Sequence, residues 1–337
     1  MIPNGPLEGQ RNFTWIRPQK RRPTEYENVT VGLQSDPERW LHVGWPLLFD
    51  DGRAPFTPNS TALRCTRWED FRDPSQLWQR PYVARANREE QTLEAMIGEA
   101  LRDGLAGAMN PVWRDVVIGK YYAAWPFVEY GECLALCYAV REALAETITF
   151  ATAFEASDKT RHGQDIVHLL FELQEAFPGF SDAAARPAWL GEQTLQPLRE
   201  MVERIVALRD WAEILVAINL VLEPLVGELF KTEFLARNAA RHGDPVTPMI
   251  LAGARRDSRR HLETTQELVR LALADPEHGA ENKKILKQWM HTWQPRSETA
   301  ALALRPIFDV SGIHAEPFEP CIERVRLHQK QIIQLDV

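Results

Sequence analysis

The sequence of 337 residues predicts an all-α protein. Apolar residues recur with helical spacing over 89–106, which gives that segment a single apolar face. The long apolar-rich segments that follow end at glycine or proline, and no stretch shows the sustained two-residue alternation typical of a strand. We therefore expect a helical bundle over 86–310, preceded by an arm over 1–85 and followed by a C-terminal helix or tail over 311–337.

The first 85 residues combine frequent prolines with many aromatic residues. Ten prolines, from Pro3 to Pro81, interrupt any helical or strand pattern. A disordered segment would be poor in aromatic residues, so this composition predicts an extended arm that lies across the surface of a partner. The candidates for the partner interface are Trp15, Tyr26, Trp40 and Trp45. The alternative is that the same aromatic residues wrap the arm around its own bundle.

The remaining chain reads as a series of helices. The expected helices are 89–106, 111–148, 149–177, 195–208, 210–242, 246–275, 282–305 and 317–331. The most apolar stretch, 214–230, contains Asn219, Glu223 and Glu228, so it falls short of the ~20 clean apolar residues of a membrane span. A helix that is apolar on nearly every side of a soluble protein belongs in the centre of a bundle.

Charge and cysteine content narrow the partners and the compartment. The formal net charge of −8 argues against nucleic acid, because phosphate binding needs a basic face. Four cysteines in so long a chain provide no disulfide framework. The N-terminus has no apolar signal-peptide region. Together these features predict a cytoplasmic protein that binds neither nucleic acid nor membrane.

One pattern occurs twice within the predicted helices. Residues 158–162 read DKTRH and residues 257–261 read DSRRH, so both copies have the form D-x-x-R-H. A single copy is readily explained as a surface helix turn in which Asp and His pair at i,i+4. Two copies on apolar helices, separated by another pair of helices, make that explanation less satisfactory.

A metal-binding bundle provides another explanation for the repeat. In ferritin-like diiron proteins two helices each carry Glu-x-x-His and two others each contribute a Glu, all directed inward. The segments here are similar to the D-E-x-R-H form of this motif in bacterial multicomponent monooxygenases, and the metal-binding Glu then corresponds to Lys159 and Ser258. Glu129 or Glu132, together with Glu223, would be remnants of the single-Glu helices.

We therefore expect a ferritin-like bundle that has lost its metal. A protonated lysine has no lone pair for iron, and serine is a weak neutral ligand, so the chain is expected to have no metal, catalytic or cofactor-binding residues. The remaining residues, Asp158, His162, Asp257 and His261, would form structural ion pairs where metal once joined four helices. On this hypothesis Lys159 supplies a fixed positive charge in place of that of iron.

Beyond these motifs, most of the chain resembles the small (beta) hydroxylase subunit of bacterial multicomponent soluble diiron monooxygenases, of the alkene and propane type. The similar segments are KRRPTEYENVTV at 20–31, DPERW at 36–40, DWAE at 210–213, NLVLEPLVG at 219–227, and Trp289, Trp293, Pro295 and Arg296 near the C-terminus.

This resemblance implies partners and a reaction that spacing cannot show. It implies a catalytic alpha subunit that holds the diiron centre, in an alpha2beta2 assembly with or without a gamma subunit. It also implies a coupling protein and a reductase that uses NADH, FAD and an iron–sulfur cluster. The implied reaction is epoxidation or hydroxylation of a small hydrocarbon, a short alkene first and a short alkane next.

Two other functions are compatible with the same residues. A free-standing metal-dependent oxidase would use two i,i+4 ligand pairs, Asp158 with His162 and Asp257 with His261, together with Glu129 and Glu223. A helical scaffold of unrelated function would use the motifs only for packing. Iron content would distinguish the oxidase, and a stable, partner-free chain would distinguish the scaffold.

Overall fold

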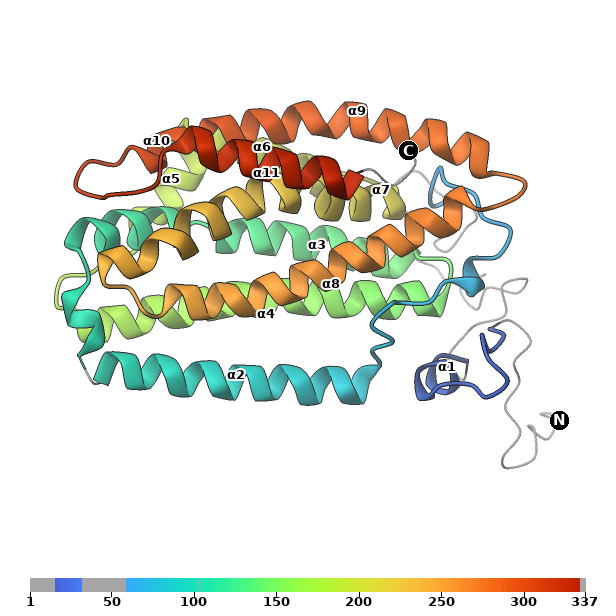
Figure 1. The fold of residues 1–337 in the computed structure, drawn as a ribbon, viewed down its shortest axis with the longest axis horizontal. Coiled ribbons are helices and arrows are strands. Elements are labelled where there is room, and N and C mark those ends of the chain that lie inside the picture. Colours follow the sequence, from blue (N-terminus) through green and yellow to red (C-terminus); the bar gives the residue numbers. More distant parts are fainter. Residues whose placement is uncertain (1–15, 32–58, 103, 334–337) are drawn as a thin grey trace, which may run out of the picture.

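The computed structural model describes residues 16–31, 59–102 and 104–333. Long helices with nearly parallel or antiparallel axes form the body of the molecule (Figure 1), and the described residues contain no β-strand. The predicted all-α bundle is thereby confirmed.

The helices follow one another with short connections. The α-helices are α1 (Glu25–Val31), α2 (Gln79–Arg102), α3 (Pro126–Glu142), α4 (Glu146–Ala176), α5 (Ala185–Gly191), α6 (Gln196–Val206), α7 (Trp211–Val216), α8 (Thr247–Leu273), α9 (Gly279–Ala303), α10 (Arg305–Phe308) and α11 (Phe318–Ile333). The π-helices are η3 (Trp113–Tyr122) and η4 (Ala217–Ala236), and the short 3₁₀-helices are η1 (Trp68–Asp70), η2 (Leu105–Ala108) and η5 (Ala239–His242).

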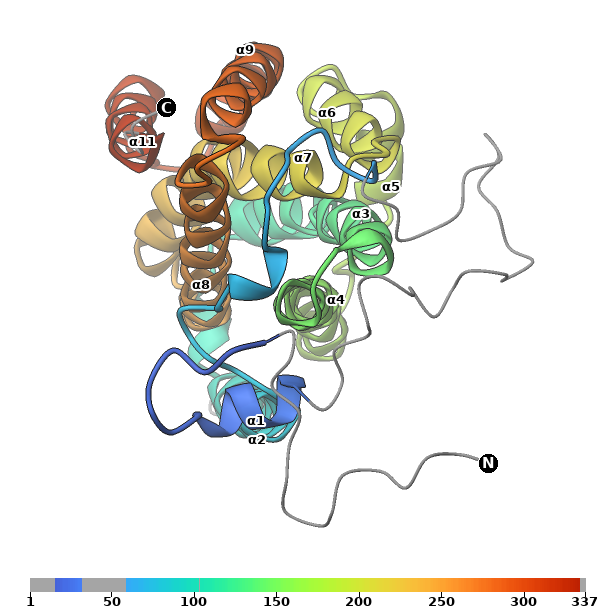
Figure 2. The ribbon, with the colours of Figure 1, turned by 90° about the vertical axis from the view of Figure 1, so that its right-hand side faces the viewer.

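The helices are arranged in layers. In the end-on view of Figure 2, α2 lies on one side and packs against α4 and α8. The next layer contains α3 and the continuous helix formed by α7 and η4, and the outermost row contains α6, α9 and α11. Helices α3, α4, η4 and α8 therefore surround the centre of the bundle. Helix α4 contacts α3 and α8, α8 contacts η4, and α7, which continues into η4, contacts α3.

Local sequence accounts for the helix boundaries. The expected single helix over 111–148 is wrong, because the chain turns between η3 and α3 and again before α4. Pro126 lies at the first turn of α3, where the missing N–H of proline does no harm. Asp210 caps α7 by accepting hydrogen bonds from the backbone N–H groups of Ala212 and Glu213 at 3.0 and 3.1 Å.

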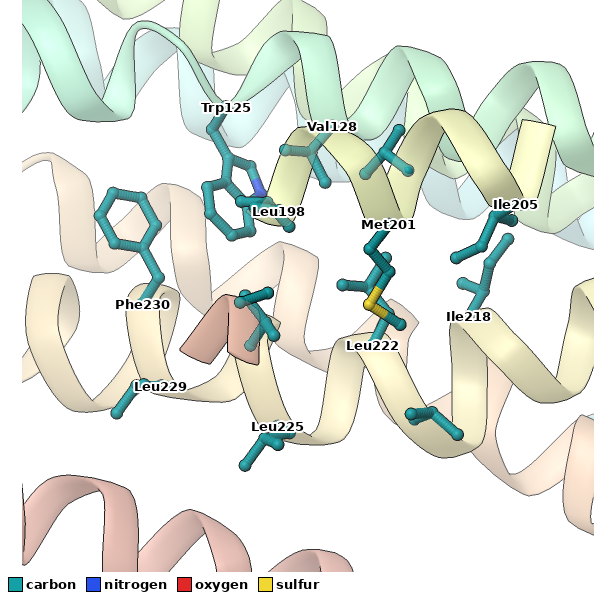
Figure 3. Close-up of a cluster of buried hydrophobic side chains, with 14 of the residues drawn as sticks. Trp125, Val128, Leu198, Met201, Ile205, Ile218, Leu222, Leu225, Leu229 and Phe230 are labelled. Carbon is teal, nitrogen blue, oxygen red and sulfur yellow. The ribbon is translucent and has the colours of Figure 1, made fainter. Parts of the chain in front are cut away.

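Buried hydrophobic side chains cluster between α3, α6 and η4 (Figure 3). Trp125 stacks on Phe230 with ring centroids 4.6 Å apart. A Cβ atom at Gly131 would lie 2.3 Å from Val202 Cγ1, so only glycine lets α3 and α6 approach this closely. Glycine at this position thus fixes the spacing of two helices around the centre.

Part of the predicted arm packs on its own bundle. Leu63, Trp68 and Phe71 are buried, and the Trp68 ring meets that of Trp211 edge-on at 5.3 Å. The backbone N–H of Thr66 donates to the Asp275 carboxylate at 2.6 Å. For the segment 59–78, the structure therefore favours the alternative in which the arm wraps its own chain.

The predicted interface residues have different outcomes. Tyr26, on α1, is only 2% exposed and accepts a 3.4 Å hydrogen bond from the Asp73 N–H. For Tyr26, packing on its own chain is therefore favoured over contact with a partner. Trp15, Trp40 and Trp45 lie outside the described residues, so their expected contact with a partner stays a prediction.

The C-terminal helix belongs to the bundle. Helix α11 lies along η4, and the Gln329 side chain donates a 3.2 Å hydrogen bond to the Val221 carbonyl. At the other end, α2 begins at Gln79, before the expected bundle boundary at residue 85. No helix in the described part of the chain is both long and apolar enough to cross a membrane.

Candidate functional site

The two D-x-x-R-H segments face each other across the contact between α4 and α8. His261 Nε2 lies 3.0 Å from Asp158 Oδ2, and His162 Nε2 lies 3.3 Å from Asp257 Oδ2. Each Asp thus pairs with the His of the opposite copy, which excludes the i,i+4 pairing within one copy that an isolated surface turn would form. All four side chains are at least 98% buried.

The arginine at the fourth position of each motif copy also pairs with the aspartate of the other copy. Arg161 reaches Asp257, and Arg260 reaches Asp158, in short charge-assisted contacts. From α2, the Tyr82 hydroxyl donates to Asp158 at 3.0 Å. These contacts hold the pKa of Asp158 well below its usual range despite burial, so α2, α4 and α8 are joined by an ionised carboxylate.

Beside these pairs, three carboxylates converge on lysine side chains. We call Glu129, Glu132, Lys159, Glu223 and Lys231 the carboxylate–lysine cluster; they come from α3, α4 and η4. Lys159 Nζ lies 2.5 Å from Glu132 Oε2, 2.5 Å from Glu223 Oε1 and 3.6 Å from Glu129 Oε2. Lys159 is 0% exposed, so its ammonium group is at the centre of these three carboxylates and away from solvent.

Lys231 forms the second half of the cluster. Its Nζ lies 2.8 Å from Glu223 Oε2 and 3.4 Å from Glu129 Oε1. Glu129 and Glu223 therefore each contact both lysines, and Glu223 Oε1 lies within 3.0 Å of both ammonium groups. The Trp125 indole N–H also donates to Glu129 Oε1 at 3.1 Å.

Burial and the neighbouring charges shift the pKa of each of these groups in the cluster. Burial lowers the pKa of Lys159, but Glu132, Glu223 and Glu129 outweigh it and raise the pKa well above its usual value. Burial raises the pKa of Glu223, but Lys159 and Lys231 reduce it to about 2. Burial raises the pKa of Glu132 well above its usual range, with further contributions from Glu223 and Glu129. The charge of Lys159 opposes this rise in the pKa of Glu132.

The local structure of η4 allows this arrangement. Glu223, Gly227 and Lys231 follow one another at intervals of four residues along the π-helix. A Cβ atom at position 227 would lie 2.2 Å from Glu223 Oε2 and 3.4 Å from Lys231 Cε. Because glycine has no side chain, the Glu223 carboxylate and the Lys231 stem occupy that space and meet each other.

The structure brings most of the predicted site residues together. Glu129, Glu223 and Lys159 are members of the cluster, and His162 Nδ1 approaches Glu129 Oε2 at 3.6 Å. Ser258 has a buried hydroxyl oxygen without a hydrogen-bond partner. Sequence reasoning missed Lys231, although a lysine within the most apolar helix, eight residues after Glu223, was a usable signal.

Two groups of side chains bring three potential metal-ligand atoms within 4.8 Å of one another in the described residues. They are Glu129 with Glu132 and Glu223, and Glu233 with Glu316 and Cys321. In the second group Arg324 binds both glutamates, with Nε 2.9 Å from Glu233 and Nη1 2.8 Å from Glu316. Neither group includes Asp158 or Asp257, whose oxygens already bind arginine and histidine, so the i,i+4 ligand pairs of a free-standing oxidase are not formed.

The first group also fails to fit a metal ion. The ammonium group of Lys159 stands within 2.5 Å of Glu132 and Glu223 oxygens, where a bound cation would need those same lone pairs. A protonated lysine repels a cation and supplies no lone pair. The Lys159 ammonium group thus takes the place that a bound cation would need between Glu132 and Glu223.

Comparisons with known proteins agree with this geometry. A family model described as methane/phenol/alkene hydroxylase matches residues 45–276. The chain is 36% identical to the propane 2-monooxygenase hydroxylase small subunit of Rhodococcus jostii, over 95% of this chain and 88% of that protein. It is 31% identical to the methane monooxygenase component A beta chain of Methylococcus capsulatus, over 94% and 82% of the two chains.

Solved structures support the fold. A chain of toluene 4-monooxygenase with bound toluene superposes with a TM-score of 0.72 at 23% identity, over 84% of this chain and 93% of that one. A chain of phenol hydroxylase from Pseudomonas sp. OX1 gives a TM-score of 0.75 at 18% identity, over 92% and 89%. Together with the sequence relatives, these results confirm the family resemblance. The chain belongs to the methane/phenol/alkene hydroxylase family, as a small (beta) hydroxylase subunit of the soluble diiron monooxygenases.

Proposed function

We propose that this chain is the non-catalytic subunit of an NADH- and O₂-dependent diiron monooxygenase. The chain supports and positions a catalytic alpha subunit, which holds the diiron centre and the substrate pocket. The chain itself has no metal, catalytic or cofactor-binding residues. A coupling protein and a reductase with FAD and an iron–sulfur cluster complete the proposed system.

The position of Lys159 is the observation that carries this proposal. Its ammonium group is fully buried and lies 2.5 Å from carboxylates contributed by two other helices. A buried ion pair persists only when its partners compensate the cost of desolvation, and here two ammonium groups do so for the glutamates. The charge that a metal would contribute to join the helices thus comes from lysine.

The proposed substrate is a small hydrocarbon. The propane 2-monooxygenase small subunits, at 32–36% identity over 95% of this chain, support a short alkane. A short alkene, the first expectation from the sequence, remains part of the proposal, since the substrate pocket lies in the partner. The assembly proposed is alpha2beta2, with or without a gamma subunit.

Reconstitution tests this function. The full chain is purified alone and together with its large subunit, and iron is measured per chain after incubation with Fe²⁺ and desalting. We expect less than a tenth of an iron atom on this chain alone and no product from propane or propene with reductase, coupling protein, NADH and O₂. The two-subunit complex is expected to hold iron and form product.

Two results would contradict the proposal. Two irons per isolated chain, with turnover of either hydrocarbon, would establish the free-standing oxidase instead. A monodisperse chain that never binds the large subunit would establish the unrelated scaffold. Comparing propane with propene in the complex then decides between the two substrate classes.

A further inference from the structure

The carboxylate–lysine cluster has the connectivity of a two-cation centre. Glu129 contacts Lys159 through Oε2 and Lys231 through Oε1. Glu223 contacts Lys159 through Oε1 at 2.5 Å, and it contacts Lys231 through Oε1 at 3.0 Å and Oε2 at 2.8 Å. Two carboxylates therefore bridge two positive charges, and Glu132 binds only Lys159 as a terminal ligand would.

Each motif copy contains a ring nitrogen without a hydrogen-bond partner, and that of His162 faces the cluster. His162 Nδ1 and His261 Nδ1 are both buried without a hydrogen-bond partner, whereas the Nε2 atoms of these rings are fixed by aspartates of the opposite motif copy. A carboxylate that accepts a hydrogen bond from one ring nitrogen of a histidine orients the other ring nitrogen toward a ligand, as around many metal-bound histidines. The Glu129 Oε2 atom is likewise buried and without a hydrogen-bond partner, 3.6 Å from His162 Nδ1.

A route from the surface leads to this place. A groove of about 1000 Å³ runs between η4 and α8 and is lined in part by Glu223, Lys231 and Ser258. Ser258 lies three residues before His261, so both side chains are on one face of α8. Ser258 lines this groove, which offers space for a longer side chain at this position.

We infer that the ammonium groups of Lys159 and Lys231 occupy the two cation positions of a ligand frame that this chain still carries. The two lysines, which exclude other cations, and the short Ser258 side chain are then what prevents this frame from binding two divalent transition metals through carboxylate and imidazole ligands. This inference rests on the proposed function, because it requires that the natural chain binds no metal.

The test is to exchange the lysines for metal. The full-length variant Lys159→Glu/Lys231→Met/Ser258→Glu removes both ammonium groups and supplies the two missing carboxylates. Cobalt(II) is the probe, bound by equilibrium dialysis and followed by its visible absorption. We expect two cobalt ions per chain and a melting temperature that rises with cobalt concentration.

The experiment gives a result even if the variant unfolds without metal. Crowding five carboxylates without a cation is expected to destabilise the chain, so cobalt should restore the helical circular-dichroism signal if the apo variant unfolds. A variant that binds fewer than two cobalt ions, or that stays unfolded in millimolar cobalt, overturns the inference.

A matched control separates the frame from a general loss of lysine. The variant Lys159→Gln/Lys231→Met/Ser258→Gln has the same side-chain sizes without the added carboxylates, and we expect at least tenfold weaker cobalt binding. Equal binding by this control would overturn the inference. Cobalt binding by the natural chain would instead overturn the proposed function, so the two failures are distinguishable.

Discussion

Replacing Lys159 with Met removes the positive charge at the centre of the cluster. The side chain is 0% exposed, and methionine keeps a similar unbranched shape, so the main loss is electrostatic. Removing one partner of a buried ion pair typically costs about 3–5 kcal/mol, since the remaining charge has no compensation. We expect a loss of that order in the free energy of unfolding at pH 7.

A second route to the magnitude gives the same result. The Lys159→Met variant retains Lys231 against the ionised Glu129 and Glu223, which leaves these three side chains with an excess of one negative charge. The fold can relieve it by protonating one glutamate. The ordinary pKa of a glutamate is about 4.3, about 2.7 units below pH 7, so protonating it at pH 7 costs about 4 kcal/mol. The penalty should therefore fall by about 1.4 kcal/mol for each pH unit between 7 and 5.

Urea unfolding of the full chain at pH 5, 6 and 7, followed by tryptophan fluorescence, measures this penalty. The matched control is Lys284→Met, because Lys284 is exposed and pairs with Glu281 only at the surface. The control should leave the midpoint unchanged at each pH. The double variant Lys159→Met/Glu223→Gln should be more stable than Lys159→Met at pH 7. A Lys159→Met penalty that does not change with pH would refute the electrostatic explanation.

Three further predictions concern the surroundings of the cluster. Gly227→Ala should lower the free energy of unfolding by about 1–3 kcal/mol, because its Cβ would lie 2.2 Å from a Glu223 oxygen. Burial would raise the pKa of Asp257, but its hydrogen bond with His162 is the main cause that lowers this pKa to about 2. Asp257→Asn should therefore lower the free energy of unfolding by about 2 kcal/mol at neutral pH. Replacing Trp15, Trp40 and Trp45 with Ala should weaken assembly with the large subunit, as measured by analytical ultracentrifugation.

Each of these predictions has a matched comparison. Gly191→Ala adds a methyl group where no atom lies within 4 Å, so an equal effect at both glycines would contradict the crowding at Gly227. The Asp257 contribution is present above its ordinary pKa and is lost as pH falls from about 4 to 2. A difference between the natural chain and Asp257→Asn that persists at pH 2 would therefore count against the lowered pKa. Unchanged assembly of the tryptophan variant would exclude these side chains as anchors.

The helical architecture was predictable because it depends on local patterns. Apolar periodicity identified the long helices, and glycine or proline marked most of their ends. The division of 111–148 was not predicted, since apolar residues recur through all of its segments and only Pro126 marks the turn between η3 and α3. The π-helical hydrogen bonding of η4 was likewise not anticipated, because it shifts backbone pairing by one residue without a clear change in composition.

The site was only partly predictable, because its contacts join distant segments. Spacing identified Lys159 and both motif copies, but it did not decide whether Asp158 pairs with His162 in the same copy or with a residue of another helix. The actual partner, His261, is 103 residues away and depends on how α4 packs against α8. Lys231 was missed for the same reason. Aromatic content described the arm but not the surface it covers, since burial against its own chain and against a partner favour the same residues.

The most direct test of the central claim is an iron anomalous-scattering map of the assembled hydroxylase. Our account predicts iron peaks in the large subunit and none between Glu129, Glu132 and Glu223 of this chain, where density for Lys159 Nζ should appear. An iron peak among these three carboxylates, with the Lys159 side chain turned away from them, would contradict it.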